Sequence, residues 1–213
     1  MKQEKEGYEE QLGRNSEKAL EAAYILIVST ASDYSDAEFV EKMIDLVKRM
    51  ERVLGEENVV NLETLNLLGV TLDDNGEYEE AIKVHERCLA RRTKVLGEEY
   101  QDTLNSLNNL GNVYGSLKNY EKALEYYERD LRGSERLLGK KHPSTLRTVM
   151  NVCKTLLEYG KAEPLYERAL QGFESQFGKD HDDTMRSAKE FEKFVLISGN
   201  EERLEVLRNI YAL

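Results

Sequence analysis

Tryptophan is absent from the 213-residue sequence, and only two prolines, two cysteines and three histidines occur in it. Two cysteines cannot build the disulfide framework of a small secreted domain, and the histidines show no zinc-ligand spacing. No apolar run approaches the roughly 20 residues that a membrane-spanning helix needs, and the first residues do not resemble a signal peptide. We therefore expect a cytoplasmic protein with no metal, no cofactor and no membrane partner.

Basic residues are also fewer than acidic residues. The sequence has 30 lysines and arginines against 41 aspartates and glutamates, which gives a formal net charge of −11. Nucleic-acid binding depends on a basic face, so this balance argues against a nucleic-acid partner. The scarcity of proline and the abundance of Leu, Glu, Lys, Ala and Arg favour helices, and a hydrophobic content of 40% is enough for a core. An all-α fold is expected.

A Leu-Gly pair recurs in the sequence every 42 residues, and a Phe-Gly pair follows 39 residues after the last of them. The pairs are Leu12-Gly13, Leu54-Gly55, Leu96-Gly97, Leu138-Gly139 and Phe177-Gly178. Between successive pairs lie two segments in which apolar residues recur at three- and four-residue spacing, which is typical of amphipathic helices. Each unit is therefore predicted to be a helix, a turn and a second helix, with the glycine as the C-cap of the second helix.

Stacked copies of such a pair predict an α-solenoid of about five antiparallel helix pairs, because one pair cannot bury its apolar face alone. The expected helices cover residues 14–31, 36–53, 58–74, 78–95, 101–116, 120–137, 143–158, 161–176, 182–197 and 200–212. We expect a single domain over residues 1–213, with copies near 13–54, 55–96, 97–138, 139–177 and 178–213. The first helix of each pair should line a concave face.

Small residues in the second and third copies predict close helix crossings. Gly69 should face Ala81, and Gly111 should occupy the same place in the third copy. This arrangement resembles the tetratricopeptide repeat, in which small residues at these places let the two helices of a pair approach. The segments 138–146 and 162–170 are also similar to the long repeats of kinesin light chains and their relatives. The resemblance implies a right-handed superhelix that binds a protein or peptide, with groove asparagines that hold an extended peptide backbone.

Two positions depart from the repeat pattern. The spacing from Leu156 to Ala162 is three residues shorter than the equivalent spacing in the third copy, so Tyr159-Gly160 should form a tight connection between the two helices. Asp130 occupies a position that a small apolar residue fills in the fourth copy. A partner on the next helix is the one role that the sequence suggests for this aspartate.

Removing the packing positions from each first helix leaves a stripe of residues on its concave side. The stripe is acidic in the early copies, rich in amides in the third copy and basic in the last two. Asparagine is a poor helix former whose amide both donates and accepts hydrogen bonds, so three asparagines on one helix face favour a role in holding a peptide backbone. The basic end favours a peptide with acidic residues. The predicted peptide-binding residues are Asn66, Asn105, Asn108, Asn112, Arg147, Met150, Lys154, Arg186 and Lys193.

Two other classes of function compete with peptide binding. The asparagines can also form an ordinary solvated face, and a structural subunit that packs into a larger assembly through its convex face or ends is the alternative function. An enzyme is a distant third, because His85 stands where other copies have Tyr127 and Tyr166, and is expected to be a packing ring. Cys88 and Cys153 occupy small packing positions with no histidine placed to activate them.

The two ends of the repeat array predict a further contact. Residues 1–11 resemble the end of a helix with nothing before it, and residues 204–213 lack a polar outer face. Terminal repeats normally need such a face for solubility. We therefore expect either a longer natural chain or end-to-end self-association.

Overall fold

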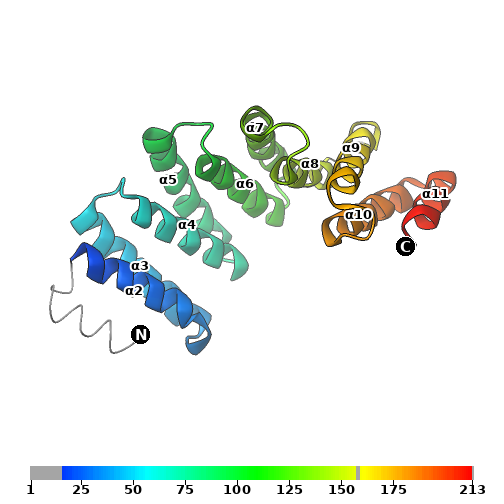
Figure 1. Cartoon of the computed structure of the whole chain (residues 1–213). Coiled ribbons are helices and arrows are strands. Elements are labelled where there is room, and N and C mark those ends of the chain that lie inside the picture. The colour runs from blue at the N-terminus through cyan, green and yellow to red at the C-terminus, as the bar shows by residue number, and fades with distance from the viewer. Residues whose placement is uncertain (1–15, 157–158, 213) are drawn as a thin grey trace. The chain divides into compact units, whose positions relative to one another are not determined.

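The structure, a computed structural model, describes residues 16–156 and 159–212, and of residues 159–161 the backbone alone. These residues form ten α-helices and one short 3-10 helix, with no strand among them (Figure 1). The elements are α2 (Glu17–Ser29), η1 (Ala31–Asp33), α3 (Asp36–Leu54), α4 (Val59–Asp74), α5 (Tyr78–Leu96), α6 (Gln101–Ser116), α7 (Tyr120–Leu138), α8 (Pro143–Thr155), α9 (Tyr159–Phe177), α10 (Asp182–Ser198) and α11 (Glu201–Tyr211). The predicted all-α fold is confirmed, and the helix boundaries differ from the expected ones by three residues or fewer. No helix in this part of the chain is both long enough and apolar enough to cross a membrane.

Glycine ends the second helices, as the repeated Leu-Gly pairs predict. Gly55, Gly97 and Gly139 follow α3, α5 and α7 with φ values of +88°, +92° and +88°. Residues with a Cβ rarely enter this backbone region. At the start of α3, Ser35 and Glu38 form a capping box in which each side chain accepts the backbone N–H of the other residue. The Leu-Gly pairs and the capping box therefore mark the ends of these helices.

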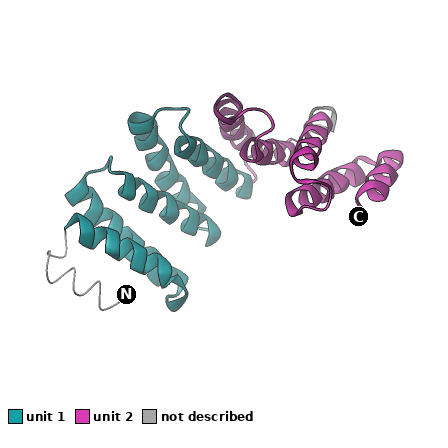
Figure 2. Cartoon of the chain, in the orientation of Figure 1, with its two compact units in different colours: residues 1–117 teal, residues 118–213 magenta. Residues whose placement is uncertain are grey.

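The chain divides into two compact units, residues 1–117 and 118–213 (Figure 2). Within each unit, consecutive helices pack against each other around a hydrophobic core. The core of the first unit is built mainly on aliphatic side chains such as Leu20, Met43 and Leu65, whereas that of the second includes the stacked rings of Tyr166 and Phe191. The boundary falls inside the third copy, after its first helix.

Lys118 begins the second unit in a left-handed conformation, with a φ of +57°. Gly76 and Gly199 occupy the equivalent turns of other copies, with φ values of +79° and +73°. A residue with a Cβ loses roughly 1–2 kcal/mol in this region. Lys118→Gly is therefore expected to raise the free energy of unfolding by about 0.5–1 kcal/mol, because the strain relieved exceeds the added entropy of the unfolded chain.

Denaturant unfolding of the full chain measures the effect of Lys118→Gly. The control is Asn119→Gly, because the Asn119 side chain accepts the Lys122 N–H as the N-cap of α7 and its loss should lower stability. A Lys118→Gly variant that is less stable than the wild type would contradict the strain at this position.

The structure tests the two departures from the repeat pattern, Asp130 and Tyr159-Gly160. Asp130 is 3% exposed, and its carboxylate accepts hydrogen bonds from Thr148 Oγ1 on α8 at 2.8 Å and from Ser134 Oγ at 2.9 Å. The expected partner on the next helix is therefore present. The expectation for Tyr159-Gly160 is wrong, because α9 begins at Tyr159 and both residues belong to the helix. Residues 157–158 of the connection lie outside the described residues, as does the first Leu-Gly pair.

Candidate functional site

The predicted asparagines lie on α4 and α6, the first helices of two successive copies in the first unit. Asn105 is exposed, and its Oδ1 accepts a hydrogen bond from Gln101 Nε2 at 3.2 Å. Asn66, Asn108 and Asn112 are half-buried. Spacings of three and four residues place the three asparagines of α6 on one side of that helix. We call these four asparagines the amide face.

Asn66 connects the amide face to the interior of the first unit. Its Oδ1 accepts one hydrogen bond from Arg92 Nη1 at 3.3 Å and another from Asn109 Nδ2 at 3.1 Å. Arg92 comes from α5 and Asn109 from α6, so Asn66 of α4 joins three helices. The Asn66 amide is therefore held in place before any ligand arrives, which lowers the entropy cost of binding.

Arg92 is missing from the predicted site, although it lies directly beneath the amide face. It is 4% exposed, and its Nη1 also donates to Asp102 O at 2.8 Å and to Ser106 Oγ at 2.9 Å. Among the described residues, no carboxylate lies within 4.0 Å of its guanidinium. An alignment of the repeat copies could have identified Arg92, because the other copies have an uncharged residue at this position. The equivalent residues are Met50, Ser134 and Phe173.

The predicted basic residues lie on α8 and α10 in the second unit and share two carboxylates. We call this set of four cations and two carboxylates the ion-pair ladder. The cations keep 46–68% of their side-chain surface exposed, so a ligand can reach them. The ladder consists of Asp183 with Arg147 (3.8 Å) and Arg186 (3.4 Å), and of Glu190 with Lys154 (3.9 Å) and Lys193 (3.1 Å).

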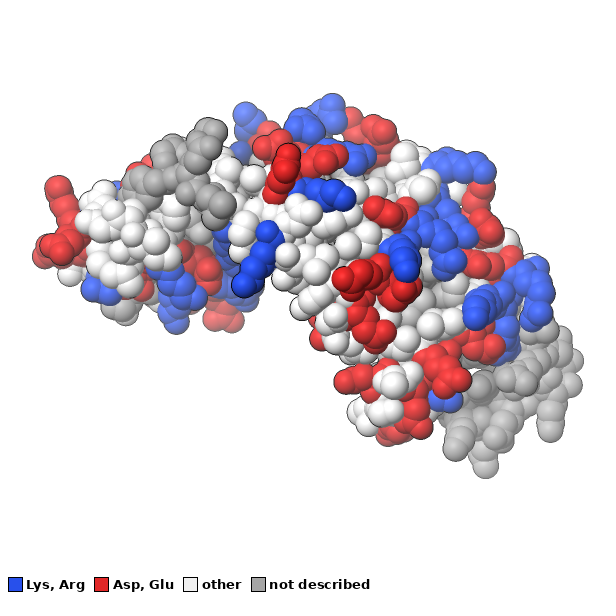
Figure 3. Space-filling model, turned by 180° about the vertical axis from the view of Figure 1, so that it is seen from behind, with Lys and Arg blue, Asp and Glu red and all other residues white. Residues whose placement is uncertain are grey.

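A shallow hollow of about 290 Å³ lies on the ladder's α10 side. It is lined by Arg186, Lys189, Glu190, Glu192 and Lys193. Lysine and arginine thus outnumber the acids around it, although the chain as a whole is acidic. On the face shown in Figure 3, basic and acidic side chains are interspersed. The excess of positive charge at the ladder is therefore local, and it suits a short acidic segment better than an extended polyanion.

Met150 does not lie on the exposed surface with the other predicted residues. It is 8% exposed and belongs to the core of the second unit. Its Sδ accepts a hydrogen bond from Ser187 Oγ at 3.3 Å, because α10 packs over this side of α8. We therefore exclude Met150 from the candidate site. Its role is to fill the space between two first helices.

His85 is fully buried, as expected for a packing ring. It lies against Gly69 of α4, where an added Cβ would come within 2.6 Å of the imidazole. Burial, and then the nearby charge of Arg92, lowers the pKa of His85 to about 4. A neutral ring at this position is thus part of the core of the first unit.

The other histidines and the two cysteines also hold structural positions. Nδ1 of His142 and of His181 accepts a backbone N–H at the start of α8 and of α10, each at 3.2 Å. Cys88 and Cys153 are free and buried, and burial raises the pKa of Cys153 to about 12. Within the described ranges, no group of three His, Cys, Asp or Glu side chains is placed to hold a metal ion.

Comparisons with known proteins agree with the repeat pattern. The Tetratricopeptide repeat family model matches residues 60–133 and 102–152. The fold is similar to the nearly identical TPR-like repeats of a Podosopora anserina protein described as a kinesin light chain, with a TM-score of 0.78, 20% identity and coverage of 91% of this chain and 93% of that one. It is also similar to BtubC (BKLC) from P. vanneervenii, with a TM-score of 0.76, 18% identity and coverage of 92% and 80%. No curated protein matches in a direct sequence comparison.

Proposed function

We propose that this chain binds an acidic linear segment of a partner protein in the cytoplasm and is not an enzyme. The match of residues 60–152 to the Tetratricopeptide repeat model supports this, because such repeats are protein-interaction modules. The observation that carries the proposal is Arg92, a buried cation beneath the amide face that has no counter-ion among the described residues. In this proposal the amide face holds the peptide backbone, and the ion-pair ladder attracts acidic side chains.

Arg92 gives the amide face its preference for acidic segments. Its Nη1 donates to two carbonyl oxygens and a hydroxyl, and these neutral acceptors solvate the cation without cancelling its charge. A charge in the protein interior acts through a lower dielectric than one in water, so its potential extends to the nearby surface. Asn66 Oδ1 accepts hydrogen bonds from both Arg92 and Asn109, so these amides lie next to the charge. A ligand carboxylate placed there is stabilised, whereas a basic segment is repelled.

The ion-pair ladder supports the same preference by a different mechanism. Asp183 and Glu190 keep only 20% and 25% of their side-chain surface exposed, whereas the four cations are more exposed. Ion pairs with a solvent-exposed member contribute only about 0–1 kcal/mol, so the cations remain available to a ligand carboxylate. The ladder's excess of cations also steers acidic segments during their approach. This mechanism mainly raises the association rate, whereas the amide face mainly slows dissociation.

Asn108→Ala/Asn112→Ala in the full chain tests the amide face. An acidic peptide recovered from a library screen on the wild type should bind this variant about 5- to 150-fold more weakly, equivalent to about 1–3 kcal/mol for lost buried hydrogen bonds. Isothermal titration calorimetry measures the affinity. In the same titrations, Arg147→Glu/Lys154→Glu should slow association and reduce its salt dependence.

Asn209→Ala on the exposed surface of α11 is the matched control and should bind like the wild type. Circular dichroism must show that the double asparagine variant keeps its helices, as expected because alanine is the better helix former. Unchanged affinity in a folded Asn108→Ala/Asn112→Ala variant would eliminate the amide face as the binding site.

A structural subunit is the second candidate function, and one observation favours it. Between the second helices α3 and α5 lies a hollow of about 260 Å³ with an apolar base that includes Ile44, Val47, Leu68 and Val84. Such a surface can pack against another subunit. If Val84→Asp abolishes assembly with a recovered partner while the double asparagine variant retains it, this second function is correct.

A further inference from the structure

The ion-pair ladder of the second unit is divided into two steps, each built around one carboxylate. The first step is Asp183 with Arg147 and Arg186, and the second step is Glu190 with Lys154 and Lys193. Two cations and one carboxylate leave each step with one positive charge in excess. The ladder therefore presents two separate positive charges to a ligand.

The two steps lie two helical turns apart. On α8, Arg147 and Lys154 are seven positions apart in the sequence, and Arg186 and Lys193 are seven positions apart on α10. Seven residues rise about 10.5 Å along a helix and return to the same side of it within about 20°. The two excess charges are therefore separated by about 10 Å along the helices.

A buried contact between α8 and α10 keeps the two steps level with each other. Ser187 Oγ donates to Met150 Sδ at 3.3 Å, and these side chains are 2% and 8% exposed. Met150 lies between the step residues of α8 in the sequence, and Ser187 lies between the two carboxylates of α10. Both helices advance by seven residues from one step to the next, so they run parallel past this contact. Core packing thus fixes the separation of the steps.

A ligand can reach both steps at once. The hollow of about 290 Å³ runs along α10 from Arg186 of the first step to Lys193 of the second. Two turns of a helix with its side chains have a volume of roughly 800 Å³, which is much larger than this hollow. An extended segment is thinner and suits the hollow better.

We propose that the ladder recognises two acidic residues three positions apart in an extended segment, with one carboxylate at each step. This specificity rests on the proposed function and defines its acidic segment more closely. In the polyproline II conformation, residues i and i+3 lie on the same side of the chain and about 9.3 Å apart. That separation matches the two steps. Acidic residues one or two positions apart point to different sides, so only one of them can contact a step.

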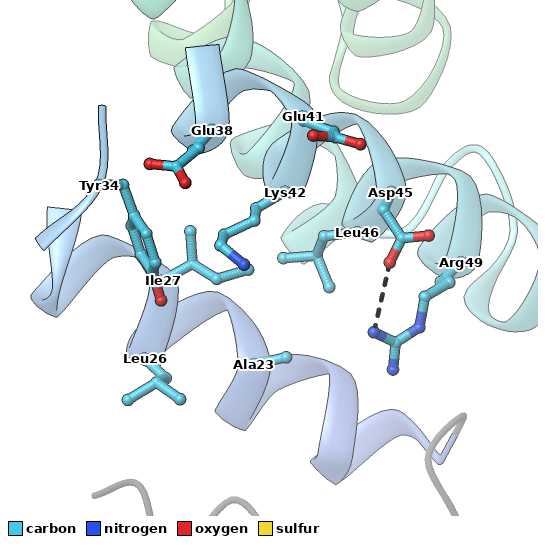
Figure 4. A pocket seen from close by; sticks show the side chains of 10 residues that line it. All are labelled: Ala23, Leu26, Ile27, Tyr34, Glu38, Glu41, Lys42, Asp45, Leu46 and Arg49. Atoms are coloured by element: carbon cyan, nitrogen blue, oxygen red, sulfur yellow. Dashed lines mark ion pairs between the residues drawn. The ribbon is translucent and has the colours of Figure 1, made fainter. Parts of the chain in front are cut away.

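The larger hollow of the first unit lacks this arrangement. It has a volume of about 360 Å³ and lies between α2 and α3 (Figure 4). Its charged side chains all belong to α3, and Arg49 and Asp45 pair across one turn of that helix at 3.7 Å. Glu38, Glu41 and Asp45 outnumber Lys42 and Arg49 around it. A segment with two acidic residues should therefore avoid this hollow, although it is the larger one.

Polyproline peptides that carry two glutamates measure the preferred spacing. With the full wild-type chain at low ionic strength, glutamates at i and i+3 should give a Kd about two- to fivefold lower than glutamates at i and i+2 or at i and i+6. The three peptides have the same charge. Glutamates at i and i+2 point to different sides, and those at i and i+6 share a side but lie about 18.6 Å apart. Fluorescence anisotropy of labelled peptides measures the three affinities.

Removing one step tests whether the ladder causes the preference. Lys154→Gln/Lys193→Gln should abolish the difference between the three peptides, because only one step remains. The matched control is Lys42→Gln/Lys83→Gln, which removes two exposed cations from the first unit and should keep the difference. Circular dichroism of each variant checks that the helices are intact.

Two results would overturn this spacing rule and leave the general preference for acidic segments intact. One is equal affinity for the three glutamate spacings, or no binding of any of them. The other is tighter binding of an alanine-rich helical peptide with glutamates at i and i+7, which presents the same separation in a helix. A polyproline peptide with lysines at i and i+3 that binds as tightly as its glutamate counterpart would contradict the proposed function itself, and the spacing rule with it.

Discussion

Gly69→Leu is expected to lower the free energy of unfolding by about 3 kcal/mol. A Cβ at this position would lie 2.6 Å from Cε1 and 2.8 Å from Nδ1 and Nε2 of His85. His85 is 0% exposed, so the ring has no free space into which it can move. Overpacking of this kind typically costs about 1–3 kcal/mol, and the near-complete overlap places Gly69 at the upper end. The gain in helix propensity on replacing glycine offsets at most about 1 kcal/mol.

Denaturant unfolding measures the cost, and a double-mutant cycle assigns it to the histidine. In the His85→Ala background, Gly69→Leu should cost at least about 1 kcal/mol less, because the new side chain can enter the space that the ring leaves. Ala90→Leu on the exposed side of α5 is the control, and its stability should stay within about 0.5 kcal/mol of the wild type. A Gly69→Leu variant that unfolds like the wild type would mean that the two helices cross elsewhere.

Acidification from pH 7 to pH 4 is expected to remove about 3 kcal/mol of stability through His85 alone. The pKa of this histidine is about 4 in the folded protein, whereas an unfolded histidine has a pKa near 6.5. Between these values the unfolded chain binds the proton and the folded chain does not, so stability falls as the pH falls. The contribution is complete above pH 6.5 and lost as the pH approaches 4. Desolvation of the imidazolium is the main cause, followed by repulsion from Arg92.

His85→Phe isolates this effect, because it keeps an aromatic ring and removes the titration. Equivalent positions of other copies hold Tyr127 and Tyr166, so a six-membered ring suits this place in the repeat. Unfolding free energies at pH 7, 5.5 and 4 should fall more steeply for the wild type than for His85→Phe, with a difference of about 3 kcal/mol at pH 4. Parallel pH profiles for the two proteins would show that another group controls acid unfolding.

The helices and the core of this protein could be predicted from residues that lie close together in the sequence. The Leu-Gly period marks the ends of the second helices, because the glycines there adopt positive φ values. Three- and four-residue spacing identifies the buried faces, and His85 was assigned to packing by comparison with Tyr127 and Tyr166. These features depend on the local backbone and on helix period, so each repeat displays them by itself.

The candidate site could be predicted only in part. The sequence predicted that the asparagines and cations lie together with Met150 on one surface, whereas Met150 is 8% exposed and is covered by α10. It also gave no indication that Asp183 and Glu190 are shared between cations of two helices. The distance between side chains on different helices depends on how each helix is rotated and shifted against its neighbour. A repeat period does not determine those small displacements.

By itself, the sequence determined the all-α repeat architecture, the ends of most helices and the packing role of His85. Only the tertiary structure decided that Arg92 lies buried without a carboxylate partner in the described residues, bonded to Asn66, Ser106 and the carbonyl of Asp102. The physical reason is the sequence separation over which each kind of interaction acts. Helix formation and capping are decided within a few residues of chain. The hydrogen-bond partners of Arg92, in contrast, come from two other helices and lie up to 26 residues away in the sequence, and only packing brings them within 3.3 Å.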